Sequence, residues 1–416
     1  MAEVTITRPA ARKAQKLAGL APYVFAQLDE RVYRLREQGA ADIVDLGKAD
    51  PDQATPAAVV RRLQETAADP ENHHYPAFRG SLFFREAVAR FYRRRFGVML
   101  DPEREVLALI GSKEGLFHIS LAYLDAGDLA VIPDPAFPAY DDGVWFAGGR
   151  AVRVPLRRHL GWLPDLDAVP ADIWRRTKLL FLNYPNNPTG VLAPRSFLER
   201  VVDLARRYAF LICYDHAYSE ITYDGRVSPS ILEVPGAKDV AVEFMTFSKT
   251  FNMAGWRLGA AVGCAEAIES LLVVQSHINS GIFAPIQFAG ATALDEVWPS
   301  PFAAALRAEY QRRRDYAVQS LRRIGWHVDP PQGAVYLWLP VPAGTDGETF
   351  AERLLETYRV VVAPGSAFGR TGKHHVRISL TTAYENVVKG IDRLAECLAK
   401  AGEPPWPDAR PEPPIW

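Results

Sequence analysis

Lys249 follows a short apolar run and is placed for nucleophilic chemistry. It stands in the segment T-F-S-K-T-F-N-M-A-G-W-R-L-G, residues 246–259. A lysine at the end of a buried strand is desolvated, which lowers the pKa of its amine and favours the nucleophilic form. Ser248 and Arg257 in the same segment could hold a phosphate, the arginine through charge-assisted hydrogen bonds. For this segment alone, a buried lysine paired with a carboxylate remains an alternative.

A second segment, V-L-A-L-I-G-S-K-E-G-L at residues 106–116, favours the binding of an anion. An apolar strand runs into a glycine turn and then into a helix, so backbone N–H groups and the positive helix end point at the turn. Gly111 permits close approach, and Ser112 adds a hydroxyl. Many such turns contain glycine without binding anything. The glycine pattern of dinucleotide-binding folds and the Walker A sequence are both absent.

Two polar side chains follow further apolar runs. In F-L-N-Y-P-N-N-P-T-G, residues 181–190, prolines and asparagines fix a turn that presents an amide side chain. In L-I-C-Y-D-H-A-Y, residues 211–218, Asp215 ends a strand where α/β sheets place their ligands. A buried aspartate there needs a cationic partner. A plain structural turn and a helix N-cap are the respective alternatives.

Short apolar runs that alternate with helical patterns must position these residues. Such runs are typical of strands buried on both faces of a parallel sheet. The predicted strands are Val106–Ile110, Leu129–Ile132, Lys178–Leu182, Phe210–Tyr214, Val242–Phe247 and Leu258–Val262. Residues 196–208 form an amphipathic helix pattern, and Ser196 with Glu199 predicts a capping box. The alternation predicts a doubly wound α/β fold with a mostly parallel sheet.

The final third changes character and predicts a smaller α+β domain. Residues 302–324 form a long helix pattern, followed by strand-like runs at 335–339 and 360–362. We therefore expect a large domain at residues 51–298 and a small domain built from residues 1–50 and 299–416. The tail from Glu403 to Trp416 has six prolines in fourteen residues, so we expect no regular structure there.

Composition excludes several classes of protein. The chain of 416 residues is 48% hydrophobic and 23% charged, with 48 basic and 49 acidic residues, so no global field attracts nucleic acid or an anionic membrane. Its three cysteines lie far apart, which predicts a reducing compartment and no metal site. The first residues have no signal-peptide core, and no apolar run is long enough to span a bilayer. We expect a cytoplasmic protein.

Together, the motifs resemble those of the class I/II aminotransferases, the fold type I enzymes that depend on pyridoxal 5′-phosphate (PLP). The resemblance covers nearly the whole chain, in the expected order. It implies a large PLP-binding domain in which Lys249 binds PLP as a Schiff base. It also implies that Asp215 keeps the pyridine nitrogen protonated, while Asn187 and Tyr218 bond the phenolic oxygen of the ring.

The resemblance assigns further residues around the cofactor and the substrate. Those expected to surround the phosphate are Ser112, Lys113 (mainly through its backbone), Thr246, Ser248 and Arg257. Phe137 would stack on the ring, and Tyr75 would reach the phosphate of a neighbouring subunit, which implies a homodimer. Arg377 would clamp the substrate α-carboxylate through two parallel bonds. From the sequence alone, Phe137 and Tyr75 would be packing residues and Arg377 a surface charge.

Three positions near these motifs depart from the family pattern. Thr246 replaces the more usual serine and keeps the hydroxyl. Ala49 stands where many relatives have a glycine whose backbone approaches the substrate carboxylate, so its methyl group could narrow the pocket. Lys48 beside it is either a surface charge or a contact for an acidic substrate.

The implied activity is the exchange of an amino group between an L-amino acid and a 2-oxo acid by a ping-pong mechanism. Residues 228–244 are similar to bacterial alanine (glutamate–pyruvate) aminotransferases, whereas residues 20–25 and 278–287 are also similar to LL-diaminopimelate aminotransferases. We expect alanine with 2-oxoglutarate or pyruvate, and LL-diaminopimelate or aspartate as alternatives. The candidates for lining the side-chain pocket are Tyr23, His277 and Asn279.

Two other classes of protein share this fold. A PLP-dependent carbon–sulfur lyase remains open, because its residues would be the same. A PLP-sensing transcription regulator would need a DNA-binding domain before Leu20 and a basic surface, contrary to the near-neutral charge. The small-molecule partners expected are therefore amino acids and 2-oxo acids.

Overall fold

The structure is a computed structural model that describes residues 14–20 and 23–400. The proline-rich tail predicted to lack regular structure lies outside the described residues. The chain divides into two units, residues 1–41 and residues 42–416. The first unit contains the helices α1 (Gln15–Ala18) and α2 (Val24–Glu37). All elements named below belong to the second unit.

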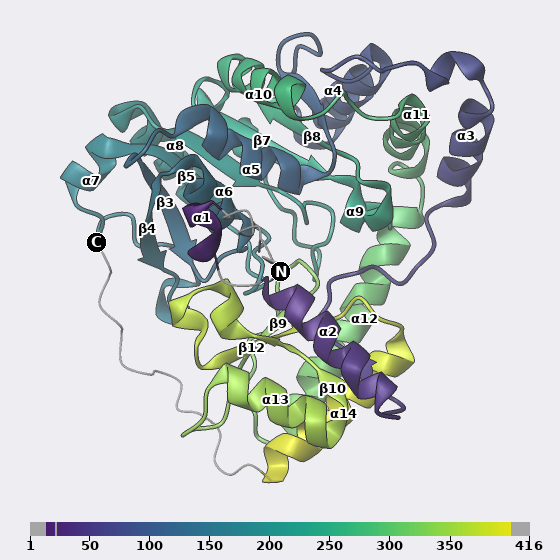
Figure 1. The fold of residues 1–416 in the computed structure, drawn as a ribbon, viewed down its shortest axis with the longest axis vertical. Helices are drawn as coiled ribbons and strands as arrows, with labels where there is room; N and C mark the ends of the chain where they lie inside the picture. The colour runs from purple at the N-terminus through teal and green to yellow at the C-terminus, as the bar shows by residue number, and fades with distance from the viewer. Residues whose placement is uncertain (1–13, 21–22, 401–416) are drawn as a thin grey trace, which may run out of the picture. The chain divides into compact units, whose positions relative to one another are not determined.

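A seven-stranded sheet forms the centre of the second unit, with β4 at one edge (Figure 1). In spatial order its strands are β2 (Val106–Leu109), β8 (Gly259–Gly263), β7 (Ala241–Thr246), β6 (Leu211–Asp215), β5 (Thr177–Asn183), β3 (Leu129–Asp134) and β4 (Arg150–Pro155). Only β8 runs antiparallel to its two neighbours, and the other pairs are parallel. The prediction of a mostly parallel α/β sheet is confirmed.

Helices pack on both faces of this sheet. One face contacts α5 (Ser112–Tyr123), α6 (Ala139–Ala147) and α10 (Ala265–Ile278). The other contacts α3 (Ala57–Ala67), α4 (Leu82–Phe96), α7 (Ala171–Arg176), α8 (Arg195–Tyr208) and α11 (Ala284–Thr292). Neighbouring residues of a strand serve opposite faces, as Val106 and Leu107 do, which is why these strands read as continuous apolar runs.

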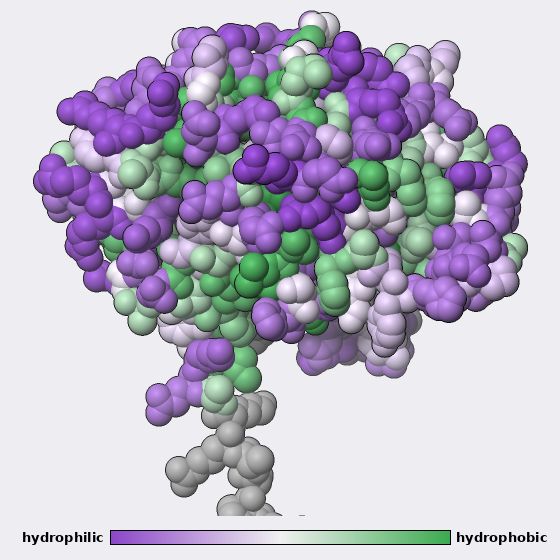
Figure 2. Space-filling model, turned by 90° about the horizontal axis from the view of Figure 1, so that it is seen from above, coloured by the Kyte–Doolittle hydropathy of each residue, from purple (hydrophilic) through white to green (hydrophobic). Residues whose placement is uncertain are grey.

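The surface over α4, α10 and α11 mixes hydrophilic and hydrophobic residues. Seen from this side, hydrophobic residues gather near the middle of the face (Figure 2). Among residues 14–20 and 23–400, no helix combines the length and the apolar character needed to cross a bilayer.

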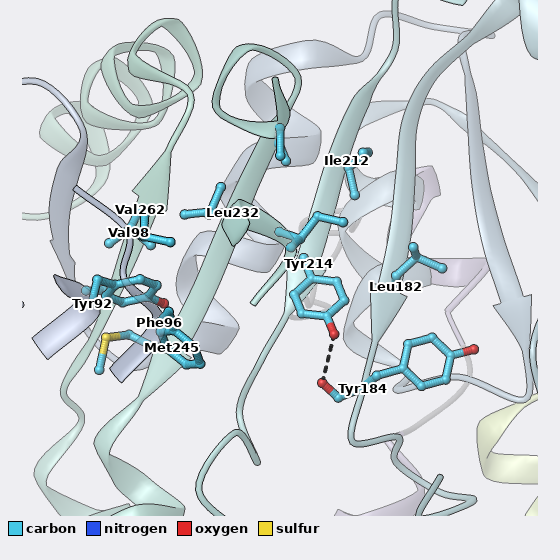
Figure 3. Packing of buried hydrophobic residues seen from close by; sticks show 14 of the residues in the cluster. Tyr92, Phe96, Val98, Leu182, Tyr184, Ile212, Tyr214, Leu232, Met245 and Val262 are labelled. Carbon is cyan, nitrogen blue, oxygen red and sulfur yellow. Dashed lines mark hydrogen bonds between the residues drawn. The ribbon is translucent and has the colours of Figure 1, made fainter. Parts of the chain in front are cut away.

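Aromatic side chains fill much of the core on the α4 and α8 face. Figure 3 shows Tyr92 and Phe96 of α4 beside Met245, and Tyr214 beside Tyr184. The buried Tyr214 hydroxyl donates to the Tyr184 carbonyl at 3.2 Å, so its polar end is satisfied inside the core.

Two details of the sequence prediction are wrong. Strand β4 was missed, because its first two residues are exposed and the rest alternate in burial, as expected of an edge strand. The capping box at Ser196 does not form. The carbonyl of Pro194 accepts from Phe197 N at 3.0 Å, so α8 begins at Arg195 and Ser196 lies inside its first turn. Glu199 pairs with Arg195 instead, at 3.0 Å.

The C-terminal part forms a second core. The antiparallel strands β11 (Ala363–Pro364), β12 (His375–Ser379) and β9 (Tyr336–Pro340) make one small sheet, and β1 (Val44–Asp45) pairs in parallel with β10 (Val360–Val361). Their apolar side chains pack against α12 (Phe302–Arg323), α13 (Gly347–Tyr358) and α14 (Tyr384–Lys400). The predicted helix and strands are confirmed here, and the domain limits at residues 50 and 298 stay a prediction.

Candidate active site

The carboxyl ends of β5, β6 and β7 meet at one edge of the sheet and place polar residues together. They end in Asn183, Asp215 and Thr246. Thr246 caps the short helix α9 (Phe247–Thr250), and its hydroxyl accepts from Ser248 N at 3.2 Å. Lys249 lies in this helix, directly beyond the sheet edge where α/β proteins bind ligands.

The Lys249 amine lies inside the protein and donates to the carbonyl of Ala49. Burial lowers the pKa of Lys249 to about 8. The negative charge of Asp50 opposes this shift, whereas Arg377 and Arg257 reinforce it. Near neutral pH, the amine can therefore both accept and release a proton.

Asp215 is buried, and its two carboxylate oxygens differ. Oδ2 accepts from the Tyr140 hydroxyl at 2.7 Å, while Oδ1 has no hydrogen-bond partner among the described residues. Burial raises the pKa of Asp215 to about 6. The Tyr140 bond, the Ala217 backbone and the charge of His216 hold this pKa down. One oxygen thus remains to face a ligand that carries positive charge.

Arg377 is buried, contrary to what its sequence alone suggests. Its Nη1 donates to Asn187 Oδ1 at 3.0 Å, and its Nη2 to the Gly47 carbonyl at 2.7 Å. The guanidinium carbon lies 4.3 Å from the ring centre of Tyr336 and 4.8 Å from that of Phe368. The planar guanidinium is thereby fixed in one orientation, as bidentate recognition of a carboxylate requires.

Tyr336 connects this arginine to Tyr218, and Asn187 connects it to Asp215. The Tyr218 hydroxyl lies 2.5 Å from that of Tyr336, and burial holds the pKa of Tyr218 well above its usual value, so the phenol stays protonated. Asn187 N donates to Asn183 Oδ1 at 2.7 Å, and Asn183 Nδ2 donates to the Asp215 carbonyl at 2.8 Å. These bonds fix the ends of two neighbouring strands relative to each other.

The start of α5 and Arg257 form a corner suited to an anion. Gly111 has a φ of +75°, and a Cβ there would lie 2.6 Å from Arg257 Nη2. A Cβ on Gly259 would lie 2.8 Å from Ser112 N. Both glycines therefore permit a guanidinium, a helix N-terminus and the Ser112 hydroxyl to converge.

The structure brings most of the predicted site residues together, but not all. Phe137 packs edge-on against Tyr140, with ring centres 5.8 Å apart. Lys113 lies in the first turn of α5. Burial raises the pKa of Asp142 in α6, and the charge of Lys113 opposes this rise, so Lys113 lies near α6. Tyr75 is 89% exposed and takes no part in the hydrogen bonds described above for Asp215, Asn187, Tyr218 and Arg377. Tyr23 belongs to the other unit, where it precedes α2.

Three residues that contact the predicted site residues were not predicted from the sequence: Tyr140, Asn183 and Tyr336. Tyr140 follows Phe137 by one helical turn in P-D-P-A-F-P-A-Y, and this spacing was the available signal. Asn183 directly follows a predicted strand, as Asp215 does. The contact of Tyr336 with Arg377 joins two strands of the small sheet, and no local pattern indicates it.

The chain was compared with known protein families. Residues 41–394 match the family described as aminotransferase class I and II. The chain belongs to this family. The relatives include LL-diaminopimelate aminotransferases of Moorella thermoacetica, 47% identical over 94% of this chain and 99% of that protein, and of Desulforudis audaxviator, 45% identical over 93% and 98%.

Solved structures agree with the fold type I assignment of this aminotransferase. Substrate-bound BacF from Bacillus subtilis superposes with a TM-score of 0.89 at 34% identity, covering 94% of this chain and 99% of BacF. A double mutant of Thermus thermophilus aspartate aminotransferase superposes with a TM-score of 0.86 at 32% identity, covering 93% and 100%. The predictions of an aminotransferase and of its cofactor PLP are confirmed.

The residues present fit PLP. The Oδ1 of Asp215, which has no partner within the described part of the chain, suits a protonated pyridine nitrogen, and the buried Lys249 amine suits the aldehyde. The corner formed by the α5 N-terminus and Arg257 suits the phosphate. Both the charge and the hydrogen-bonding capacity of the site match the three polar ends of this cofactor.

Proposed function

We propose that this aminotransferase takes LL-diaminopimelate as its amino-group donor. The observation that carries the proposal is the similarity, over nearly the full length of both chains, to proteins named LL-diaminopimelate aminotransferases. This similarity favours the alternative raised from the sequence over the alanine preference, which no relative named above supports. It also argues against the carbon–sulfur lyase interpretation.

The charges around Ala49 suit such a substrate. LL-diaminopimelate carries a second ammonium and a second carboxylate at its far end. Lys48 and Asp50 flank the residue whose carbonyl holds the Lys249 amine, and both are exposed. In this proposal they offer opposite charges to the two distal groups.

Lys249 is the residue proposed to move protons in the reaction. When bound, PLP supplies an electron sink for the electron pair left by the departing α-proton. With a pKa of about 8, the Lys249 amine removes this proton as a general base and returns it as an ammonium. The Ala49 carbonyl, its hydrogen-bond partner, orients the amine.

The other residues bind and orient. Arg377 holds the α-carboxylate, with its guanidinium fixed by Asn187 and Gly47. With PLP bound, Asp215 would keep a positive charge on the ring nitrogen, Asn187 and Tyr218 would bond the phenolic oxygen, and Phe137 would stack on the ring. The proposed phosphate ligands are Ser112, Lys113 through its backbone, Thr246, Ser248 and Arg257.

We expect LL-diaminopimelate to be used with a kcat/KM at least about a hundredfold above that of alanine, because unpaired polar groups in the pocket would disfavour the short apolar side chain. The measurement is a screen of amino-acid donors with the purified enzyme, which is expected to be yellow and to lose this colour when a donor reacts. The yellow form is then regenerated with 2-oxoglutarate, pyruvate or oxaloacetate to rank the acceptors. A kcat/KM for alanine or aspartate equal to that of LL-diaminopimelate would refute the assignment. Release of pyruvate and a thiol from cystathionine without an acceptor would instead indicate a lyase.

We further propose that the aminotransferase works as a homodimer. Residues 75–82 and 273–283 adjoin, since Gln275 Nε2 donates to the Phe78 carbonyl at 3.1 Å. Gln287 also bridges them, because its Oε1 accepts from Ser81 N at 2.7 Å and its Nε2 donates to the Ile282 carbonyl at 2.6 Å. These segments expose large apolar side chains, namely Tyr75, Phe78, Leu82, Val273, Ile278 and Phe283. A clustered apolar surface of this kind suits a second copy of the chain.

Mixing two impaired variants tests whether Tyr75 acts in the neighbouring site. Lys249→Ala and Tyr75→Ala are each expected to lose activity as homodimers. In a re-equilibrated equal mixture, about a quarter of all sites should combine an intact Lys249 with an intact Tyr75 from the other subunit. Recovery of activity would support the shared site. If Tyr75 acts within its own subunit, the mixture stays inactive.

A further inference from the structure

Two neighbouring arginines of α12, Arg313 and Arg314, are both buried but hold different parts of the chain. Arg314 makes a bidentate pair with Asp224, at 2.7 and 2.8 Å, and a further pair with Asp315 at 2.6 Å. It thereby fixes the turn after Tyr223, whose ring it also covers. None of these partners belongs to the proposed site.

Arg313 instead joins two segments that border the site. Its Nη1 and Nη2 make a bidentate pair with Asp52, at 2.8 and 3.0 Å. Nη1 also donates to the carbonyls of Leu380 and Thr382, at 3.0 and 2.6 Å, just beyond β12. Nε donates to Glu309 at 2.8 Å. The rigid fork of an arginine can serve all these acceptors at once, which a single ammonium cannot.

Asp52 ends a short segment, residues 47–52, that we call the strap. Its Gly47 carbonyl accepts from Arg377 Nη2, and its Ala49 carbonyl accepts from the Lys249 amine. The strap therefore contacts both Arg377, which is proposed to bind the α-carboxylate, and Lys249, which is proposed to transfer the proton.

The strap is anchored on both sides of Ala49. Before it, Asp45 Oδ1 accepts from Gly47 N at 2.8 Å, and the Thr381 hydroxyl donates to the Lys48 carbonyl at 3.2 Å. After it, Arg313 holds Asp52. Because Arg313 also holds the carbonyls on either side of Thr381, it fixes the strap and the end of β12 relative to each other.

We propose that Arg313 is a positioning residue for the transamination reaction. By holding Asp52 and the end of β12, it sets the Gly47 carbonyl against Arg377 and the Ala49 carbonyl against Lys249. It touches neither substrate nor cofactor. The inference rests on the roles proposed above for Arg377 and Lys249.

The test compares Arg313→Lys with Arg314→Lys, a matched change in the next residue of the same helix. In Arg313→Lys, a loosened strap should raise the KM for the amino-acid donor about tenfold through Arg377, since α-carboxylate binding is lost equally in ground and transition states. It should lower kcat by no more than about threefold through Lys249, whose amine keeps its place but is less well oriented. Arg314→Lys should lower the melting temperature to a similar degree and leave KM at its wild-type value.

A second readout uses the apoenzyme and added PLP. The rate of PLP uptake should rise with pH as Lys249 loses its proton, with a midpoint near the lysine pKa of about 8. The Ala49 carbonyl stabilises the ammonium form, so Arg313→Lys should shift this midpoint downwards. Asp50, Arg257 and Arg377 keep their charges in both variants. Asp50 lies in the strap and its charge raises the lysine pKa, so its movement away from the amine in Arg313→Lys would shift the midpoint in the same downward direction. Arg314→Lys should keep the wild-type midpoint.

Asp52→Asn keeps Arg313 in place and serves if Arg313→Lys fails to fold. It should reproduce both shifts, and the double variant should be no worse than either single one, because the two residues act as a pair. Equal KM values and equal midpoints for Arg313→Lys and Arg314→Lys would overturn the inference. Arg377→Met separates the failure of this inference from the failure of the proposed function. An unchanged KM in Arg377→Met refutes the role of Arg377 itself, whereas a raised KM leaves only the role of Arg313 in question.

Discussion

Replacing Lys249 with alanine should lower kcat by at least about a thousandfold, since the variant loses the group that moves the α-proton. It also loses the attachment point of PLP, so the yellow colour of the holoenzyme should change. The measurement is a single-turnover reaction with LL-diaminopimelate, followed by absorbance. Because the amine is buried beside Arg377 and Arg257, solvent water is a poor substitute for it.

Lys178→Ala is the matched control for this experiment. Lys178 is exposed and lies near the start of β5, at the end of the strand opposite Asn183. Its loss should leave kcat and the absorbance spectrum unchanged. A Lys249→Ala enzyme that retained wild-type turnover would refute the assignment of the catalytic base and, with it, the proposed mechanism.

Most of the central sheet could be predicted from the sequence because its strands are buried on both faces. Such strands leave a local signature, a continuous apolar run, and all six predicted runs correspond to strands. Edge strand β4 has no such run. The antiparallel direction of β8 was not predicted either, since hydrophobic periodicity carries no information on strand direction.

A site residue could be predicted from the sequence when its neighbours along the chain indicate its role, and could not when its role depends on contacts with distant residues. Lys249 and Asp215 follow buried strands, and their neighbours in sequence indicate a ligand site. Arg377 could be assigned only through the family resemblance, because its partner Gly47 lies 330 residues away. Arg313 shows the same limit, since the partners that distinguish it from Arg314 become neighbours only on folding.

The prediction of a capping box at the start of α8 was wrong for a different reason. Ser196 and Glu199 have the right spacing, but Pro194 provides the carbonyl that starts the helix, and the serine then lies too far inside it. A proline two residues before a capping pattern thus moves the helix start. The serine–glutamate spacing alone does not reveal this competition.

Replacing Asp215 with asparagine should lower kcat by about a hundred- to a thousandfold while the fold is retained. Asparagine has the same shape, and its carbonyl can still accept from the Tyr140 hydroxyl. However, a neutral amide does not stabilise a positive charge on the ring nitrogen, so the electron sink weakens. Single-turnover rates at saturating donor measure the effect.

The pH profile separates the charge of Asp215 from its packing. Its pKa is about 6, and a bound pyridinium lowers it further, so wild-type activity should show an acidic limb at or below about pH 6 as the carboxyl is protonated. This limb lies below, and is separate from, the fall near pH 8 as the Lys249 amine is protonated. Asp215→Asn should lack this acidic limb. Tyr140→Phe removes a hydrogen bond that lowers the pKa, so it should move the limb to higher pH. If Asp215→Asn kept both the wild-type kcat and the acidic limb, the carboxylate would not be the group that holds the proton on the cofactor ring.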